Sequence, residues 1–231
     1  TSENIGGVLN KVMSVPADDL NEELLGILLA QAAAMGKGDQ LADPLKQLVE
    51  TIHADSPATR LEIAGSTLNR MLNDAGDILK NDAAFIDVLS SALDAAMISA
   101  RDESHDEDQR SSAIRFADIA ERFTGDTSLD TSEFFTPQTP QAVQLAAANV
   151  AAQRANKDTI GQLLSYWNSF PPAVKSKVIA TFLSRESTTK QALEAVDSSQ
   201  ISTADFNATQ RDELLNHRND EIRAIAKKLF G

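Results

Sequence analysis

Residues 102–108 form the most acidic stretch of the sequence, and their spacing is the one that most resembles a metal site. Four oxygen-bearing residues stand at the first four ligand spacings of an EF-hand calcium loop: Asp102, Ser104, Asp106 and Asp108. The rest of that pattern is missing, because Glu107 stands where the loop needs glycine and Ala113 where it needs a bidentate glutamate. We therefore predict a solvated loop between two helices, with weak calcium binding as the alternative.

The three histidines are the other side chains suited to metal binding or proton transfer. His53 and His217 fall near predicted helix ends, where a cation complements the helix dipole. Only His105 lies close in sequence to other strong ligands, which are the acids around it. Helix-end roles are therefore the prediction for His53 and His217, and a zinc- or haem-ligand role is the alternative for the three histidines.

Basic residues recur at one position of a repeated helical pattern: Arg60, Arg110, Lys175 and Arg223. In a stack of repeated helix pairs, each unit contacts only its neighbours. We therefore expect these side chains to hydrogen-bond to the adjacent unit or to helix-end carbonyls. A ridge that binds a ligand is the alternative.

The aromatic residues suggest a core position and a junction. Trp167 is the only tryptophan, and we predict that its ring fills the core, with ligand stacking as the alternative. Phe134 and Phe135 precede a proline-punctuated turn at residues 136–140. We interpret this turn as a junction between two sub-arrays, and an exposed aromatic pair that binds a partner is the alternative.

The sequence contains no nucleophile elbow, P-loop or dinucleotide-binding glycine motif. It has no cysteine, which excludes disulfides, thiolate metal sites and a C-x-x-C-H haem attachment within these residues. With 21 basic against 34 acidic residues, the formal charge of −13 repels nucleic acid and anionic membrane surfaces. No stretch approaches the roughly 18 uninterrupted apolar residues of a membrane span.

The elements that would position these residues are all helical, because no stretch alternates apolar and polar residues as a strand does. Apolar residues recur instead at helical spacing, and Asp, Asn or Ser followed by Pro or by a helical run marks the starts. The predicted helices are Leu20–Met35, 43–52, 56–72, Asp82–Ala100, Asp106–Phe123, 139–154, Asp158–Trp167, Pro171–Ser184, Ser187–Val196, Asn207–Asn216 and Asn219–Phe230.

Internal repeats indicate how these helices are organised. Shifting the chain by 115 residues places Ile52 on Trp167, Pro57 on Pro172 and Arg60 on Lys175, with apolar residues on apolar residues around them. A second-helix signature recurs at steps of 34 and 31 residues from position 109 to 143 to 174. The steps from 59 to 109 and from 174 to 222 are 50 and 48 residues, which we interpret as irregular units.

This unit resembles the HEAT repeat and the phycobilisome-lyase-like HEAT repeat. From about Phe134 to Gly231, three strings are similar to one segment of large bacterial envelope proteins: TPQTPQAVQLAAANVAAQ, LLSYWNSFPPAVKSKVIATFLSR and LLNHRNDEIRAIAKKLFG. Those proteins join a putative membrane-bound dehydrogenase, of β-propeller type, to a HEAT segment and a C-terminal c-type cytochrome domain. The resemblance implies a periplasmic or cell-envelope location, and a haem domain after Gly231.

We therefore predict an all-α α-solenoid of HEAT-like two-helix repeats over residues 1–231, with 1–133 and 134–231 as candidate sub-arrays. The start of the sequence lacks an initiator Met, and we expect the chain to be a piece of a longer protein. The predicted function is a non-catalytic scaffold that binds protein or positions neighbouring domains and holds no cofactor itself. The alternatives are a lyase-like or chromophore-handling protein, which needs a concave cleft with a perturbed acid or histidine, and a free-standing regulatory adaptor.

Overall fold

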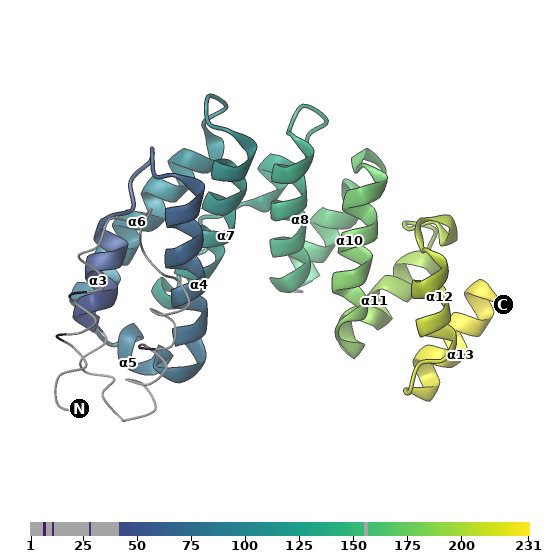
Figure 1. The fold of residues 1–231 in the computed structure, drawn as a ribbon. Helices are drawn as coiled ribbons and strands as arrows, with labels where there is room; N and C mark the ends of the chain where they lie inside the picture. The colour runs from purple at the N-terminus through teal and green to yellow at the C-terminus, as the bar shows by residue number, and fades with distance from the viewer. Residues whose placement is uncertain (1–6, 8–10, 12–27, 29–41, 155–156) are drawn as a thin grey trace. The chain divides into compact units, whose positions relative to one another are not determined.

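A computed structural model describes residues 42–154 and 157–231 of the chain, together with residues 7, 11 and 28 (Figure 1). This part contains eleven α-helices and no strand, so the predicted all-α class is confirmed for it. The helix predicted at Leu20–Met35 lies outside the described residues. The chain divides into two compact units, Thr1–Asp130 and Thr131–Gly231.

The first unit contains five described helices, which pack in pairs. They are α3 (Ala42–Glu50), α4 (Ala58–Asp74), α5 (Gly76–Lys80), α6 (Ala83–Arg101) and α7 (Glu107–Thr124). The most extensive contacts join α6 to α7, α4 to α7 and α3 to α6, and Figure 1 shows α4 and α7 side by side. The core between them is largely apolar, and the rings of Phe85 and Phe123 meet edge to face at 5.9 Å.

Local side-chain chemistry fixes where α6 and α7 begin and where α7 ends. Asp82 accepts the Phe85 N–H at 3.0 Å, and Asp106 accepts the Gln109 N–H at 2.7 Å, so each carboxylate caps a helix start. Gly125 follows α7 with φ of 79°, a left-handed conformation that costs glycine nothing. Both helices therefore begin at the predicted residues.

Helix α6 has the length and composition of a membrane-spanning helix, and no other described helix does. Its side chains divide by face, however. Phe85, Leu89 and Leu93 are buried among its neighbours, whereas Asp87 and Asp94 are exposed. This division is the pattern of an amphipathic core helix, and length and composition by themselves assign no span.

Two predicted helix starts in this unit are wrong. Helix α3 already includes Ala42, so Asp43 and Pro44 lie inside its first turn rather than at its cap. Pro57, not Ser56, is the N-cap residue of α4, because the Ser56 hydroxyl accepts the His53 N–H at 2.8 Å within the preceding turn. The short helix α5 was not predicted at all.

The second unit contains six α-helices in its described part. They are α8 (Gln141–Arg154), α9 (Lys157–Ser165), α10 (Pro172–Leu183), α11 (Glu186–Asp197), α12 (Ala208–Leu215) and α13 (Asp220–Phe230). Short 3-10 turns lie at Thr131–Phe134, Trp167–Ser169 and Thr203–Asp205. The most extensive contacts join α8 to α10, α12 to α13, α10 to α11 and α11 to α13.

An aromatic cluster closes the core near the start of this unit. The Phe135 ring meets the Phe170 ring edge to face at 5.0 Å and the Tyr166 ring at 5.6 Å, and Trp167 meets Phe170 at 6.3 Å. Phe134 and Phe135 are both buried. The alternative of an exposed Phe134–Phe135 pair is therefore wrong, because these rings pack inward.

The boundaries of α9 also differ from the prediction. The helix includes Lys157, so Asp158 lies within its first turn instead of capping it, and the helix ends at Ser165 before a separate 3-10 turn. The predicted capping box of α12 is confirmed, since Asn207 and Gln210 each accept the other's backbone N–H.

We predict that Asp82→Ala lowers the free energy of unfolding by about 1 kcal/mol, because the Phe85 N–H loses its acceptor. Urea unfolding followed by circular dichroism measures this change. Asp87→Ala is the matched control, since Asp87 lies exposed on the same helix. An equal loss in both variants would show that the cap contributes nothing specific.

Candidate functional site

Two of the recurring basic residues bind backbone carbonyls. The buried Arg110 Nε donates to the Ala100 carbonyl at 3.1 Å, in the last turn of α6. The Arg223 guanidinium donates to the His217 carbonyl at 2.6 Å and also pairs with Asp220. The Ala100 carbonyl lies in the last turn of α6, where the helix supplies no partner, and the His217 carbonyl lies in the turn after α12. Both contacts therefore satisfy carbonyls that no helix pairs.

The other two recurring residues lie in different surroundings. Lys175 Nζ stands 5.7 Å from the centre of the Trp167 ring and 3.4 Å from an Asp205 oxygen. Asp205 also accepts the Trp167 indole N–H at 2.8 Å. Trp167 is buried, so this contact pairs a polar N–H that would otherwise lie unsatisfied in the core. Arg60 lies half-buried in the first turn of α4.

Two carboxylates of the acidic loop at residues 102–108 accept hydrogen bonds from within the loop and from the start of α7. Asp102 accepts both the backbone N–H and the hydroxyl of Ser104, at 2.9 and 2.7 Å, and these hydrogen bonds lower the pKa of Asp102 below its ordinary 3.8. Asp106 caps α7. Two of the four calcium-like positions are thus engaged in the turn and in the helix start.

His105 joins a serine and an aspartate in the order that nucleophilic catalysis uses. Its Nδ1 lies 3.2 Å from the Ser99 hydroxyl, and its Nε2 lies 3.4 Å from the Asp55 carboxylate. A catalytic triad needs a serine that reaches the substrate and a buried carboxylate that orients the imidazole. Here Ser99 is 0% exposed and the Asp55 side chain is 96% exposed, so burial is reversed and the arrangement is unsuited to acyl transfer.

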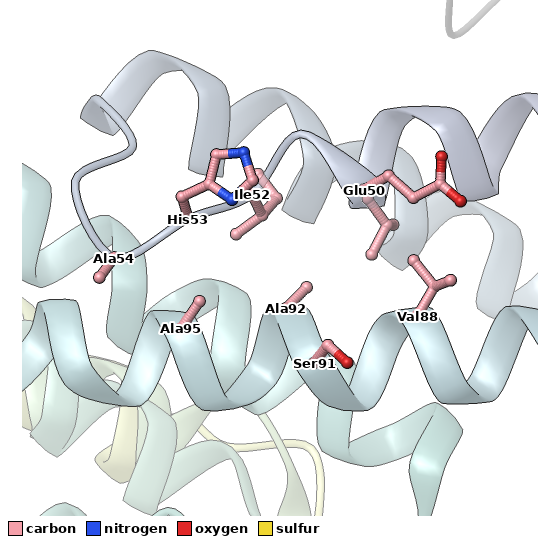
Figure 2. Close-up of a pocket in the computed structure, with 9 residues that line it drawn as sticks. Glu50, Ile52, His53, Ala54, Val88, Ser91, Ala92 and Ala95 are labelled. Atoms are coloured by element: carbon pink, nitrogen blue, oxygen red, sulfur yellow. The ribbon is translucent and has the colours of Figure 1, made fainter.

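His53 lies at a hollow between the C-terminal end of α3 and the exposed face of α6, with a cavity volume of about 410 Å³. Figure 2 shows Ile52, His53 and Glu50 on one side and Val88, Ala92 and Ala95 of α6 on the other. The floor is apolar, and His53 and Glu50 are exposed at the rim. Its volume falls in the range of small-molecule sites, in a hollow that is open to solvent. No sequence pattern pointed to it, since its two walls are distant in the chain.

His217 follows α12, as predicted for a helix-end residue, and its Nδ1 accepts the Asn219 N–H at 3.1 Å. Its carbonyl is the acceptor for Arg223. His217 therefore contributes to the turn between α12 and α13. The structure places the three histidines in three separate environments: a hollow, an interloop contact and a turn.

Ion pairs join α11 to α13 and to the turn before it. Glu186 contacts Arg218 at 3.2 Å and Asn219 at 3.0 Å, Lys190 pairs with Glu221, and Asp197 pairs with Lys228 at 2.8 Å. The Asn219 hydrogen bond, with the charge of Arg218 beside it, lowers the pKa of Glu186 below its ordinary 4.5. The Glu221 hydrogen bond raises the pKa of Lys190 above its ordinary 10.5.

These two pKa shifts predict that the α11–α13 contact is strongest at a pH between the ordinary carboxyl value of 4.5 and the ordinary lysine value of 10.5. A lowered carboxyl pKa contributes stability that is present above pH 4.5 and is lost as the pH falls through the pKa of folded Glu186. A raised lysine pKa contributes stability below pH 10.5 that is lost as the pH rises through the pKa of folded Lys190.

The measurement is urea unfolding at a series of pH values for the wild type and for Glu186→Gln. The stability difference between them is expected to shrink as the pH falls below 4.5. Glu213→Gln, at an exposed position on α12, is the control. A difference that stays constant with pH would contradict the assignment.

Among the described residues, no three His, Asp or Glu side chains converge as metal ligands. No protein-family model, curated protein or solved structure matches the chain. The resemblance to HEAT repeats and to the envelope dehydrogenase segment therefore stands on the residues quoted above. Of the arrangements described, the His53 hollow is a concave surface of small-molecule size, and three of the four recurring basic residues, Arg110, Lys175 and Arg223, have structural contacts.

Proposed function

We propose that this chain is a non-catalytic scaffold built as a HEAT-like α-solenoid, which holds a partner protein or the neighbouring domains of its own chain. On this proposal its surface, and not a catalytic pocket, carries the function. The proposal includes an origin in a larger envelope redox protein, as the similarity of residues 134–231 suggests.

One observation carries the repeat architecture: the spacing of long-range contacts in the second unit. Eight polar contacts between different helices or their flanking turns join residues 31 to 34 positions apart: Phe135–Ser169, Asn149–Thr181, Gln153–Arg185, Ser176–Gln210, Glu186–Arg218, Glu186–Asn219, Lys190–Glu221 and Asp197–Lys228. A constant separation arises when successive helix pairs stack in the same orientation. The value agrees with the 31- and 34-residue steps of the sequence pattern.

The first unit supports a longer repeat. Its polar contacts between α3–α4 and α6–α7 join residues 50 and 53 positions apart: Asp55–His105, Glu62–Ser112 and Glu62–Arg115. This separation agrees with the 50-residue step from position 59 to 109. The 48-residue step from 174 to 222 has no such counterpart, since it pairs α10 with α13, whereas α13 contacts α11 and α12.

A scaffold reading also fits the chemistry of the polar clusters. Arg110 and Arg223 bind carbonyls of their own fold, and Ser99 is buried behind His105. Each cluster has a structural role that needs no substrate. In the described part of the chain, burial of Ser99, the hydroxyl that the His105 imidazole contacts, is the main argument against hydrolysis.

We predict that the purified chain shows neither a haem absorption band nor dye-linked oxidation of sugars or alcohols. An active-site-directed fluorophosphonate is expected to leave its intact mass unchanged, because Ser99 is buried. Bound haem, turnover, or labelling that disappears in Ser99→Ala would overturn the scaffold function. Reading the coding sequence after Gly231 for C-x-x-C-H tests the proposed parent protein separately.

The hollow beside His53 favours a second candidate function, a chromophore-handling protein. Its apolar floor and the exposed Glu50 and His53 at the rim suit a flat ligand with polar edges. We rank chromophore handling below the scaffold function because the hollow is a single site in the first unit and gives the second unit no role.

Titration with a linear tetrapyrrole tests this candidate. If the hollow binds it, the absorption band of the pigment shifts on addition of the wild type, and Ala92→Phe, which fills the floor, abolishes the shift. Ala180→Phe, at an exposed position of α10, is the matched control. An identical spectrum with wild type and Ala92→Phe would remove chromophore handling at this hollow.

A further inference from the structure

A polar groove lies between α8 and the C-terminal half of α10, with a cavity volume of about 540 Å³. Asn149 and Gln153 line it from α8, and Lys177, Thr181 and Arg185 line it from α10 and the residues after it. The two helices run parallel here, because Asn149 contacts Thr181 and Gln153 contacts Arg185, four residues further along each. The groove therefore extends along both helices.

The charge of this groove is opposite to that of the whole chain. Acidic residues outnumber basic residues 34 to 21, yet the lining contains two cations and no carboxylate. Within the described residues, neither Lys177 nor Arg185 pairs with an acid. Five other cations of the same unit do have acidic partners within 4 Å: Lys175, Lys190, Arg218, Arg223 and Lys228. The groove is thus a local positive surface on an acidic protein.

Structural hydrogen bonds engage only part of the two cationic groups, Lys177 and Arg185. Arg185 Nη2 donates to the Gln153 carbonyl at 2.9 Å, which satisfies the end of α8, but a guanidinium has five N–H groups. Lys177 is exposed, and its ammonium makes no hydrogen bond within the described residues. Its charge stabilises no structural contact, so it is available to a partner.

The spacing of the two cations defines the partner. Lys177 lies six residues before the end of α10, a helical advance of about 9 Å, and Arg185 follows two residues after that end, at the start of α11. Four residues of an extended peptide advance about 13 Å. Carboxylates two or four residues apart lie on one face of an extended segment, and this range of spacing suits both cations.

We propose that the α8–α10 groove binds an extended acidic segment of a partner protein, with one carboxylate at Lys177 and another at Arg185. This assignment rests on the proposed scaffold function and names the surface and chemistry by which it holds a partner. The amides of Asn149 and Gln153 lie beside the cations and provide hydrogen-bonding groups for the peptide backbone.

The test is fluorescence anisotropy at low salt, with a labelled Gly/Ser peptide that carries two glutamates four residues apart. Saturable binding by the full chain is expected, and binding is expected to fall about tenfold in Lys177→Glu, where attraction becomes repulsion. Lys227→Glu, which makes the same charge change at an exposed position on α13, is expected to bind as the wild type does. Arg185→Gln is a second variant, checked for folding by circular dichroism because Arg185 also contacts α8.

Three outcomes would overturn the proposal: equal weakening by Lys177→Glu and Lys227→Glu, equal binding of a peptide with glutamine in place of glutamate, or tighter binding of oligothymidylate than of the peptide. If the chain is haem-free and inactive but does not bind the peptide, the groove proposal is wrong and the scaffold function still stands. Discovery of haem or turnover with peptide binding intact removes the scaffold function and leaves the groove.

Discussion

A helix with one apolar face is stable in water only while another helix covers that face, and this constraint governs both units of the chain. In α8 the covered side is built largely from alanine, with Ala147, Ala148 and Ala151 fully buried. Alanine leaves little side chain between the two backbones, which favours close approach by α10, the helix that makes the most extensive contacts with α8. Removing any one helix would expose the face of its neighbour.

The open ends of the helices impose the second constraint. Each helix ends in carbonyl groups that no residue of the same helix can satisfy. Arginine side chains from nearby elements satisfy several of these and of the adjoining turn carbonyls, through Arg110, Arg185, Arg211 and Arg223. A basic residue that recurs in the sequence can therefore reflect backbone hydrogen bonding as much as binding. Lys177, which makes no such contact, differs from them for this reason.

Local signals predicted most helices, and features set by packing were missed. Asp82, Asp106 and Asn207 cap the helices that follow them, because a side chain and the backbone two or three residues later decide a helix start. Helix α5 was missed because five residues are too short to show a helical period. Ser56 was misassigned because its hydroxyl had a nearer donor in the preceding turn.

Contacts between residues far apart in the chain could not be predicted from a single sequence. Asp55 and His105 are 50 residues apart, and Trp167 and Asp205 are 38 apart, so their meeting depends on how the helices stack. The 50-residue step of the periodic pattern equals the Asp55–His105 separation, but no step equals the 38 residues between Trp167 and Asp205, and the pattern does not say which side chains meet. For the same reason, the His53 hollow and the α8–α10 groove appear only once the helices are placed.

The position of Trp167 has a spectroscopic consequence. Trp167 and Tyr166 are the only tryptophan and tyrosine of the chain, and both belong to the second unit. Near-ultraviolet emission thus reports on that unit alone, while far-ultraviolet ellipticity sums the helices of both. The indole is buried against Asp205 and Lys175, so opening of the second unit changes its emission at once. Coincident or separated transitions in the two signals would reveal whether the two units unfold as one cooperative body.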